Sequence, residues 1–212
     1  MLHSPKWIKG RAILAENRST VWYLTFFPSG VALGIVSTLI PLYLVQELKG
    51  SLIDLGAMTF AATASLIPAS IYLGRLPDQY RRAKPFILAS FFGMSSIFFL
   101  MSITTNVTIF QFLYVLMGLL SYLREPSTTI LIAESVERSE RRSVYARLGF
   151  IEGIGGVTGL AMCTLTVNLL GYKELLRLTC PLLLISFFLA LLTIRDPALY
   201  IERFLDRYDR LI

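Results

Sequence analysis

Six runs of apolar residues, each long enough to cross a lipid bilayer, dominate this sequence. The runs cover residues 21–46, 52–73, 86–104, 107–132, 143–170 and 175–194. A transmembrane helix needs about 17 to 25 mostly apolar residues, allowing for tilt. Only 16% of the residues are charged, which is far below the roughly one quarter found in soluble domains. The sequence therefore predicts an all-α membrane protein with six transmembrane helices.

Positive charge is distributed unevenly between the loops. Four segments hold four Lys or Arg residues each, namely 1–20, 74–85, 134–147 and 195–212. If the spans alternate in direction, all four segments lie on one side, and the opposite side receives only Lys49, Lys173 and Arg177. Because Lys and Arg concentrate in cytoplasmic loops, we expect both termini to face the cytoplasm.

The two ends of the chain have the pattern of surface helices rather than of spans. Residues 1–20 mix basic and apolar side chains, which predicts a cytoplasmic amphipathic segment on the membrane surface. Residues 195–212 follow the spacing of an amphipathic helix, which predicts a second cytoplasmic amphipathic helix; the apolar residues concerned are Leu199, Phe204, Leu205, Tyr208 and Leu211. The predicted six-helix bundle, residues 21–194, lies between them.

Several functional classes lack the residues that they need. The single histidine, His3, leaves no Ser and His pair for hydrolysis, and the glycines at 153–159 lack the lysine of a phosphate-binding loop. The cations gather at the ends of apolar runs, unlike the basic stripe of a nucleic-acid-binding protein. Cys163 and Cys180 lie inside spans, which favours apolar packing over a disulfide or a metal site. We therefore expect no enzymatic activity, no cofactor, no bound metal and no nucleic-acid partner.

Small residues recur along two of the spans. They are Ala57, Ala61, Ser65 and Ala69 in the second run, and Gly149, Gly153, Gly155, Gly156 and Gly159 in the fifth. Such spacing lets a membrane helix approach its partner closely, and helix packing alone is a sufficient explanation for it. The short turns at 49–51 and 104–106 further predict that consecutive helices are antiparallel neighbours.

A sequence motif follows the second run. It reads Gly74, Arg75, Leu76, Pro77, Asp78, Gln79, Tyr80, Arg81, Arg82, Ala83. Together with the order of the spans, it resembles the loop between the second and third helices of the major facilitator superfamily, whose pattern is close to G-x-L-A-D-R-x-G-R-R/K. The glycine, the leucine, the acid and one arginine keep their places, whereas Gln79 and Arg81 depart from the pattern. The resemblance covers nearly the whole chain and implies one six-helix half of a carrier, built from 3+3 pseudo-repeats.

The resemblance implies a conformational role for this loop. In that reading Gly74 lets another helix approach, and Asp78 faces the positive end of a neighbouring helix. Arg82 pairs with Glu134 across the cytoplasmic surface, so that one conformation is held shut. The alternative is that these are solvated charges that only set the topology.

Two features of the family are missing. Tyr114 stands where many members have an arginine four residues before a glycine, here Gly118. The glycines of the fifth run also lack the proline of the antiporter signature. These differences favour an unspecified member of the family over a drug and proton antiporter.

Three charged residues lie inside predicted spans. They are Arg124 and Glu125 in the fourth run and Glu152 in the fifth. Each costs about 2.5 to 3.5 kcal/mol at a helix centre, so each needs a partner or water. Arg124 lies about ten residues from Glu134, and Glu152 lies about ten from Arg142, so the two reach a similar depth. This predicts an ion pair of Arg124 with Glu152, and the alternative to a functional role is a network that only satisfies buried groups.

Glu125 falls on a polar face of the fourth run. That face consists of Gln111, Tyr114, Gly118, Tyr122, Glu125 and Thr129. The spacing places these residues on one side of a helix, and by resemblance this helix lines the central cavity of a carrier. The candidate residues of the substrate or proton pathway are therefore Gln111, Tyr114, Tyr122, Arg124, Glu125 and Glu152.

The sequence thus predicts a multi-pass protein of the cell membrane that transports a small solute by alternating access, as one half of a carrier. The partners that this requires are the lipid bilayer, a small-molecule solute with or without a coupling ion, and a second half. The second half could be another chain, a second copy in a homodimer, or residues absent from this sequence. The alternative is a non-transporting truncated remnant or a membrane assembly subunit, which the end of the sequence after one half favours.

Overall fold

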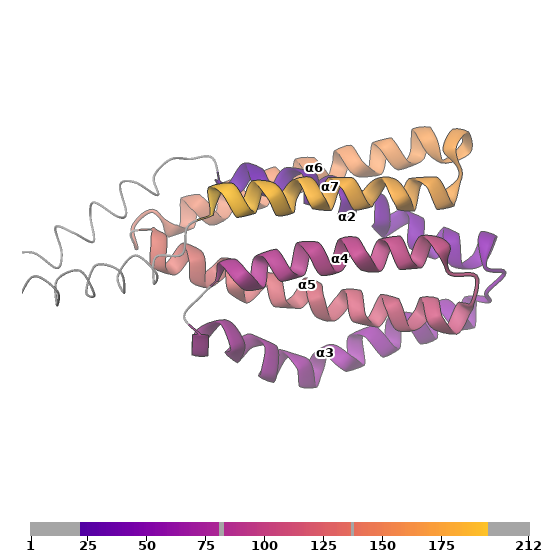
Figure 1. Cartoon of the computed structure of the whole chain (residues 1–212), viewed down its shortest axis with the longest axis horizontal. Helices are drawn as coiled ribbons and strands as arrows, with labels where there is room; N and C mark the ends of the chain where they lie inside the picture. Colours follow the sequence, from indigo (N-terminus) through magenta and orange to yellow (C-terminus); the bar gives the residue numbers. More distant parts are fainter. Residues whose placement is uncertain (1–21, 81–82, 137, 195–212) are drawn as a thin grey trace, which may run out of the picture.

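The computed structural model of the chain describes residues 22–80, 83–136 and 138–194, and their regular structure is entirely helical (Figure 1). The elements are a 3₁₀ turn η1 (Trp22–Thr25), α2 (Phe26–Leu42), a π-helical segment η2 (Tyr43–Glu47), α3 (Leu52–Tyr80), α4 (Lys84–Ile103), α5 (Val107–Ser135), α6 (Arg141–Leu170) and α7 (Tyr172–Thr193). With η1, α2 and η2 counted as one, six helices of the described part are long and apolar enough to cross a membrane. The number of predicted spans is therefore confirmed. The amphipathic segments predicted at 1–20 and 195–212 lie outside the described residues.

Side-chain caps and a glycine fix the turns between the spans. The Ser51 N–H donates to Asp54 Oδ2 at 2.8 Å and the Asp54 N–H donates to Ser51 Oγ at 3.2 Å, which is a reciprocal capping pair at the start of α3. Asn106 Oδ1 accepts the Thr108 N–H at 2.8 Å at the start of α5. Gly171 alone joins α6 to α7, and its φ of 79° lies in a region that favours glycine.

The second span continues as a helix beyond the apolar run. α3 extends to Tyr80, so Gly74 and Asp78 lie on a helix, and the prediction that they lie in a loop is wrong. A helix satisfies its backbone hydrogen bonds within its own segment, so the change from apolar to polar residues marks the membrane boundary without ending the helix. α3 is also bent near its middle (Figure 1), where Pro68 lacks the N–H that would bond to the Ala64 carbonyl.

Most helices pack against a partner that is distant in the sequence. α2 packs most extensively on α6, α4 on α7, and α3 on α5, followed by the pairs α2–α7 and α4–α5. The prediction that consecutive helices are neighbours is therefore right for α4 and α5, but wrong for α2 with α3 and for α5 with α6, which share few contacts. Short turns make consecutive helices antiparallel, whereas the shapes of the helix faces select the packing partner.

The packing has the symmetry expected of two repeats. In this symmetry, which exchanges the triplet α2–α4 with the triplet α5–α7, α2 corresponds to α5, α3 to α6 and α4 to α7. The α2–α6 contact then corresponds to the α5–α3 contact, and the α2–α7 contact corresponds to the α5–α4 contact. Because each triplet contains an odd number of spans, the two repeats run in opposite directions through the membrane. This arrangement agrees with the predicted 3+3 pseudo-repeats.

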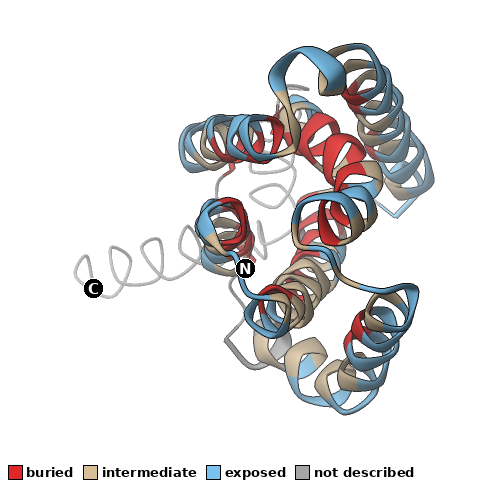
Figure 2. Cartoon of the chain, turned by 90° about the vertical axis from the view of Figure 1, so that its right-hand side faces the viewer, coloured by how far each residue is buried: buried red, intermediate tan, exposed pale blue. Residues whose placement is uncertain are grey.

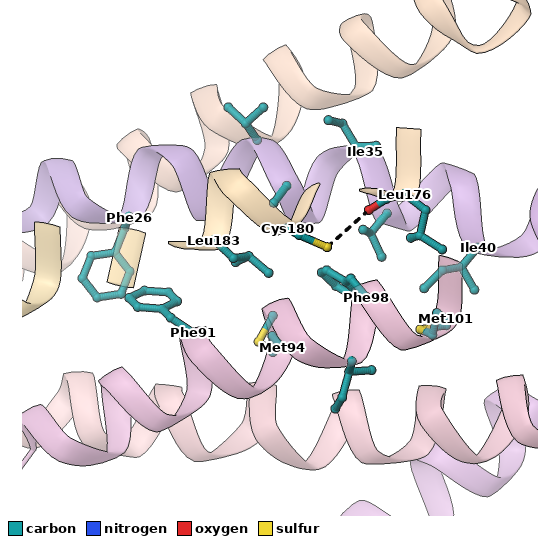
Figure 3. Packing of buried hydrophobic residues seen from close by; sticks show 14 of the residues in the cluster. Phe26, Ile35, Ile40, Phe91, Met94, Phe98, Met101, Leu176, Cys180 and Leu183 are labelled. Carbon is teal, nitrogen blue, oxygen red and sulfur yellow. Dashed lines mark hydrogen bonds between the residues drawn. The ribbon is translucent and has the colours of Figure 1, made fainter. Parts of the chain in front are cut away.

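The core lies where α2, α4 and α7 meet (Figure 3). The rings of Phe26 and Phe91 contact each other edge to face, with centroids 5.7 Å apart. Cys163 and Cys180 are buried free thiols, which confirms that they serve apolar packing. The outer faces of the helices are exposed (Figure 2) and rich in large apolar side chains, as contact with lipid requires.

Glycines of α2 and α6 permit close contact between these two helices, which form the most extensive helix pair in the described structure. A Cβ on Gly34 would overlap the carbonyl oxygen of Gly156, and a Cβ on Gly159 would overlap the carbonyl oxygen of Val31. By contrast, a Cβ on Gly149 would meet nothing within 4 Å. The close approach predicted for the fifth run is therefore confirmed for part of its glycines.

Only part of the stripe of small residues predicted in the second run lies against other helices, since Ser65 and Ala69 are half-buried. Ala57 and Ala61 are exposed, whereas Met58 and Ala62 are buried. The prediction that Ala57 and Ala61 pack closely is therefore not met among the described residues. Small size permits close packing, but it does not determine which face meets a partner.

Candidate functional site

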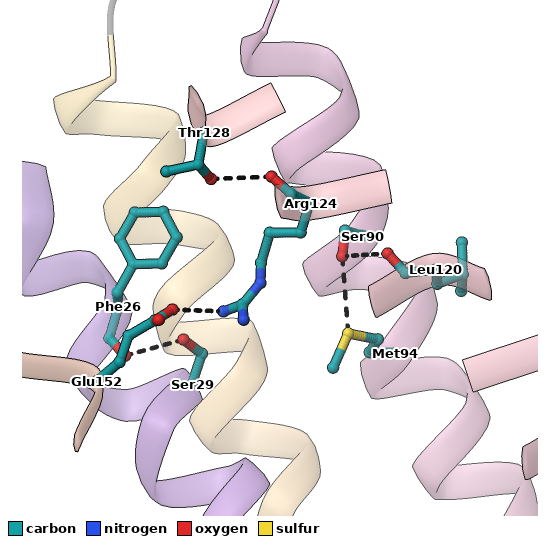
Figure 4. Close-up of polar contacts among 8 residues, drawn as sticks. All are labelled: Phe26, Ser29, Ser90, Met94, Leu120, Arg124, Thr128 and Glu152. Carbon is teal, nitrogen blue, oxygen red and sulfur yellow. Dashed lines mark hydrogen bonds and ion pairs between the residues drawn. The ribbon is translucent and has the colours of Figure 1, made fainter. Parts of the chain in front are cut away.

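Arg124 and Glu152 form an ion pair inside the membrane-spanning region (Figure 4). Nη1 of Arg124 donates to Oε1 of Glu152 at 2.8 Å, and the two side chains are 9% and 31% exposed. Each residue lies about four positions from the middle of its span, Val107–Ala133 or Arg141–Leu170. At a rise of 1.5 Å per residue, this is about 6 Å from the span centre. The ion pair predicted from the sequence is present.

α2 provides the surroundings of this pair (Figure 4). The ring centre of Phe26 lies 5.7 Å from Cζ of Arg124, a distance at which a guanidinium is attracted to an aromatic face. The carbonyl of Phe26 accepts a hydrogen bond from Ser29 Oγ at 2.9 Å. Trp22 packs against the same ring, with centroids 6.1 Å apart. The guanidinium therefore lies between an acid and an aromatic cluster.

Two residues close to Arg124 alter the hydrogen bonding of the α5 helix. Thr128 Oγ1 donates to the Arg124 carbonyl at 2.9 Å, and Pro126 has no N–H for the carbonyl of Tyr122. Hydrogen bonds from Ser or Thr to the preceding turn, and prolines within a helix, are both associated with helix bending. Arg124 thus lies beside a position where α5 lacks one backbone hydrogen bond.

The polar face predicted on α5 is partly shielded. Gln111 Nε2 donates to the Asp54 carbonyl of α3 at 3.0 Å, while Tyr114 and Tyr122 are partly buried. Glu125 is exposed and forms no ion pair with any residue that the structure describes. The structure therefore separates Glu125, on the exposed face, from Arg124, which points toward α6.

Much of the loop motif lies beyond what the structure describes. A Cβ on Gly74 would meet nothing within 4 Å, so this glycine makes no close contact with the described residues. Arg82 is outside the described residues, and the side chains of Asp78 and Glu134 are also not described. The pairing of Arg82 with Glu134 stays a prediction.

Arg141 contacts the end of α5, which the sequence analysis did not predict. Its Nε donates to the Val136 carbonyl at 3.1 Å, and its Nη2 donates to the Ala133 carbonyl. A cation at the carboxyl end of a helix satisfies free carbonyl groups and complements the helix dipole. Arg141 therefore links the start of α6 to the end of α5 through hydrogen bonds. The position of this arginine shortly after the end of the apolar run is the sequence feature that could have predicted the contact.

The contribution of the first span was also missed. Gly30 and Gly34 lie four residues apart and face Gly155 and Gly156 of α6. Their spacing is visible in the sequence and could have predicted this contact. No sequence signal marks Phe26 as the aromatic neighbour of Arg124.

A family model described as the Major Facilitator Superfamily matches residues 22–207, which include all six spans. The chain belongs to the Major Facilitator Superfamily. This confirms the resemblance drawn from the motif at Gly74 and from the order of the spans. Membership of the superfamily, with six helices able to cross a membrane, makes the chain a multi-pass membrane protein. It also groups the chain with carriers rather than with enzymes.

Two relatives within the superfamily carry the same name. Multidrug resistance protein MdtG of Citrobacter koseri is 32% identical over 190 residues, which are 85% of this chain and 45% of the relative. Multidrug resistance protein MdtG of Salmonella paratyphi B is 32% identical over 197 residues, which are 89% of this chain and 47% of the relative. The chain thus spans about half the length of the curated relatives it matches.

Proposed function

We propose that this superfamily member is one half of an alternating-access carrier that moves a small solute across the membrane. The observation that carries the proposal is the ion pair of Arg124 and Glu152, which lies near the span centres with Glu152 31% exposed. An unpaired charge at such depth costs about 2.5 to 3.5 kcal/mol, and charged groups inside membrane proteins commonly mark the path of a substrate or an ion.

The site that we propose combines the ion pair with the polar face of α5. Glu152 is the more accessible member of the pair, and Glu125 is exposed on the polar face. Tyr114 and Tyr122, on the same face as Glu125, add hydroxyl groups and aromatic surface. Gln111 lies on the same face about 21 Å farther along α5, so it belongs to the proposed pathway rather than to the contact with Glu125. A solute with both polar and apolar groups finds partners of each kind here.

A second half would complete this site. The relatives are about twice as long as this chain, and Glu125 is exposed without an ion pair among the described residues. In carriers of this kind, the binding site lies near the midplane at the interface between repeats or halves. We propose that Glu125 contacts the solute, or carries a coupling proton, once a second half encloses it.

The name of the relatives supports a narrower proposal about the solute. Both are named multidrug resistance proteins, which is a statement about those proteins. Two acids with exposed surface, Glu125 and Glu152, and the partly exposed rings of Tyr114 and Tyr122 offer partners to a solute that has both charged and apolar groups. We therefore propose a small amphipathic, drug-like molecule as the transported solute, although the sequence motifs alone favour an unspecified member of the family over a drug and proton antiporter.

Transport into proteoliposomes tests the proposal. The chain is co-expressed with a second half or enriched as a dimer, and uptake of the drug-like fluorescent cation ethidium is compared with that of Glu125→Gln. We expect Glu125→Gln to lower the uptake rate and to flatten its pH dependence between about pH 5 and pH 8, because the exchangeable proton is lost.

The matched control is Glu174→Gln, which changes an exposed acid at the opposite end of the bundle, where it pairs with Arg177 at 2.6 Å. This variant should transport like the native chain. Robust uptake with an unchanged pH profile in Glu125→Gln would show that Glu125 is structural. Absence of uptake in every preparation would favour the membrane assembly subunit instead.

A further inference from the structure

The two helices that carry the ion pair share few contacts with each other. α5 packs on α3 and α4, whereas α6 packs mainly on α2. The 2.8 Å contact between Arg124 and Glu152 is therefore maintained by helices whose positions are set by other partners. α2 is the element that touches both members, because Phe26 faces the guanidinium and Gly30 lies against the backbone of Glu152.

The contact at Gly30 leaves no room for a side chain. A Cβ on Gly30 would lie 2.7 Å from the carbonyl oxygen of Glu152, 3.3 Å from its Cα and 3.3 Å from the Cα of Gly155. All of these are backbone atoms of a helix, so they can move away only if α6 itself moves. Phe26 lies one turn before Gly30, so a single face of α2 contacts both charged residues.

We infer that Gly30 is a positioning residue for the ion pair, since the absence of a side chain at this position sets the distance from Glu152 to Arg124. The relevance of this inference to transport rests on the proposed function, because Arg124 and Glu152 belong to the proposed site. A displacement of α6 by a few tenths of an ångström matters, because hydrogen bonds weaken once the heavy atoms separate beyond about 3.2 Å.

Two glycines of α6 allow matched variants. A Cβ on Gly155 would lie 2.7 Å from the carbonyl oxygen of Phe27 and 3.1 Å from the Cα of Gly30, so Gly155→Ala enters the same contact from the opposite side. A Cβ on Gly153 would meet nothing within 4 Å, although Gly153 is adjacent to Glu152 in the sequence. Gly153→Ala therefore changes helix propensity without displacing α6.

Modification of Arg124 by phenylglyoxal provides a test that does not require transport. The full chain is purified in lipid nanodiscs, and the rate of modification is mapped by mass spectrometry. An arginine released from a carboxylate is expected to react faster, and Glu152→Gln defines the rate of the released state. Arg177, which pairs with Glu174 at the far end of the bundle, is the internal reference.

We expect Gly30→Ala and Gly155→Ala to raise the rate at Arg124 about threefold, which corresponds to the roughly 0.6 kcal/mol average of polar contacts between membrane helices. The rate at Arg177 should stay at its native value, and Gly153→Ala should leave both rates unchanged. In the Glu152→Gln background, Gly30→Ala should add nothing, because the pair is already absent. If Gly30→Ala does not fold, Gly155→Ala carries the test.

Three results would overturn the inference. The first is a native rate at Arg124 in both Gly30→Ala and Gly155→Ala. The second is a parallel rise at Arg124 and Arg177, which would show general loosening. The third is a further rise when Gly30→Ala is added to Glu152→Gln. The two proposals can fail separately. A native modification rate at Arg124 in both Gly30→Ala and Gly155→Ala, together with normal ethidium uptake, would overturn this inference and leave the proposed function standing. Failure of ethidium uptake would count against the proposed function and would not affect the modification rates.

Discussion

Removal of Glu152 should destabilise this protein more than removal of Arg124, although each substitution breaks the same ion pair. The reason is the unequal exposure of the two side chains, 9% for Arg124 and 31% for Glu152. In Glu152→Ala the guanidinium remains buried without its acid, about 6 Å from the span centre. In Arg124→Leu the remaining carboxylate belongs to the less buried partner, and in the proposed solute pathway it faces water.

The expected magnitudes follow from this asymmetry. A buried charge that loses its partner costs up to about 3 to 5 kcal/mol, and a charge near the centre of a membrane helix costs about 2.5 to 3.5 kcal/mol. Because Phe26 still attracts the guanidinium, we expect Glu152→Ala to cost about 2 to 3 kcal/mol. Arg124→Leu should cost about 1 kcal/mol, since the less buried acid is hydrated in the proposed solute pathway and a leucine favours insertion.

Thermal unfolding in detergent, followed by the fluorescence of the size-exclusion peak, measures these differences. For a chain of this length, 1 kcal/mol shifts the Tm by about 2 to 4 °C. The double variant should lose less than the sum of the two single variants, because it contains neither unpaired charge. Glu174→Ala, at an exposed acid that pairs with Arg177 in the first turn of α7, is the control and should change stability by no more than about 1 kcal/mol. Equal losses in the two single variants, or strict additivity, would refute the reasoning.

Three further predictions address topology and packing. A cysteine placed at the exposed Thr105 should react with an impermeant reagent outside intact cells and one at Gln79 should not, and the reverse pattern would contradict cytoplasmic termini. Gly34→Ala should lower the free energy of unfolding by about 1 to 3 kcal/mol through overpacking against α6. Its control, Gly149→Ala, should be neutral or stabilising by up to about 1 kcal/mol. Equal Tm values for the two variants would contradict the glycine contact. Asn106→Ala should cost about 0.5 to 2 kcal/mol by removing the cap of α5, and a Tm equal to that of Thr105→Ala would show that the cap contributes nothing.

The sequence was informative about the site wherever a charge conflicted with its surroundings. Arg124 and Glu152 were recognised as partners because each is costly alone and both lie at similar depth. Phe26 could not be recognised, because an aromatic residue is unremarkable in an apolar span. Hydropathy also gives the wrong end for α3. The change from apolar to polar residues at Gly74 marks the membrane surface, whereas the helix continues to Tyr80.

The sequence by itself determined the number of spans and the presence of charges within them, because insertion into a bilayer depends on the transfer free energy of each segment separately. The tertiary structure decided which helices meet. The contact of α2 with α6 depends on the surfaces around Gly30 and Gly34 fitting those around Gly155 and Gly159, and the exposed Ala57 shows that small residues alone do not select a partner. Lipid solvates every apolar face about equally well, so partner choice inside the membrane depends on shape and polar contacts between segments distant in the sequence.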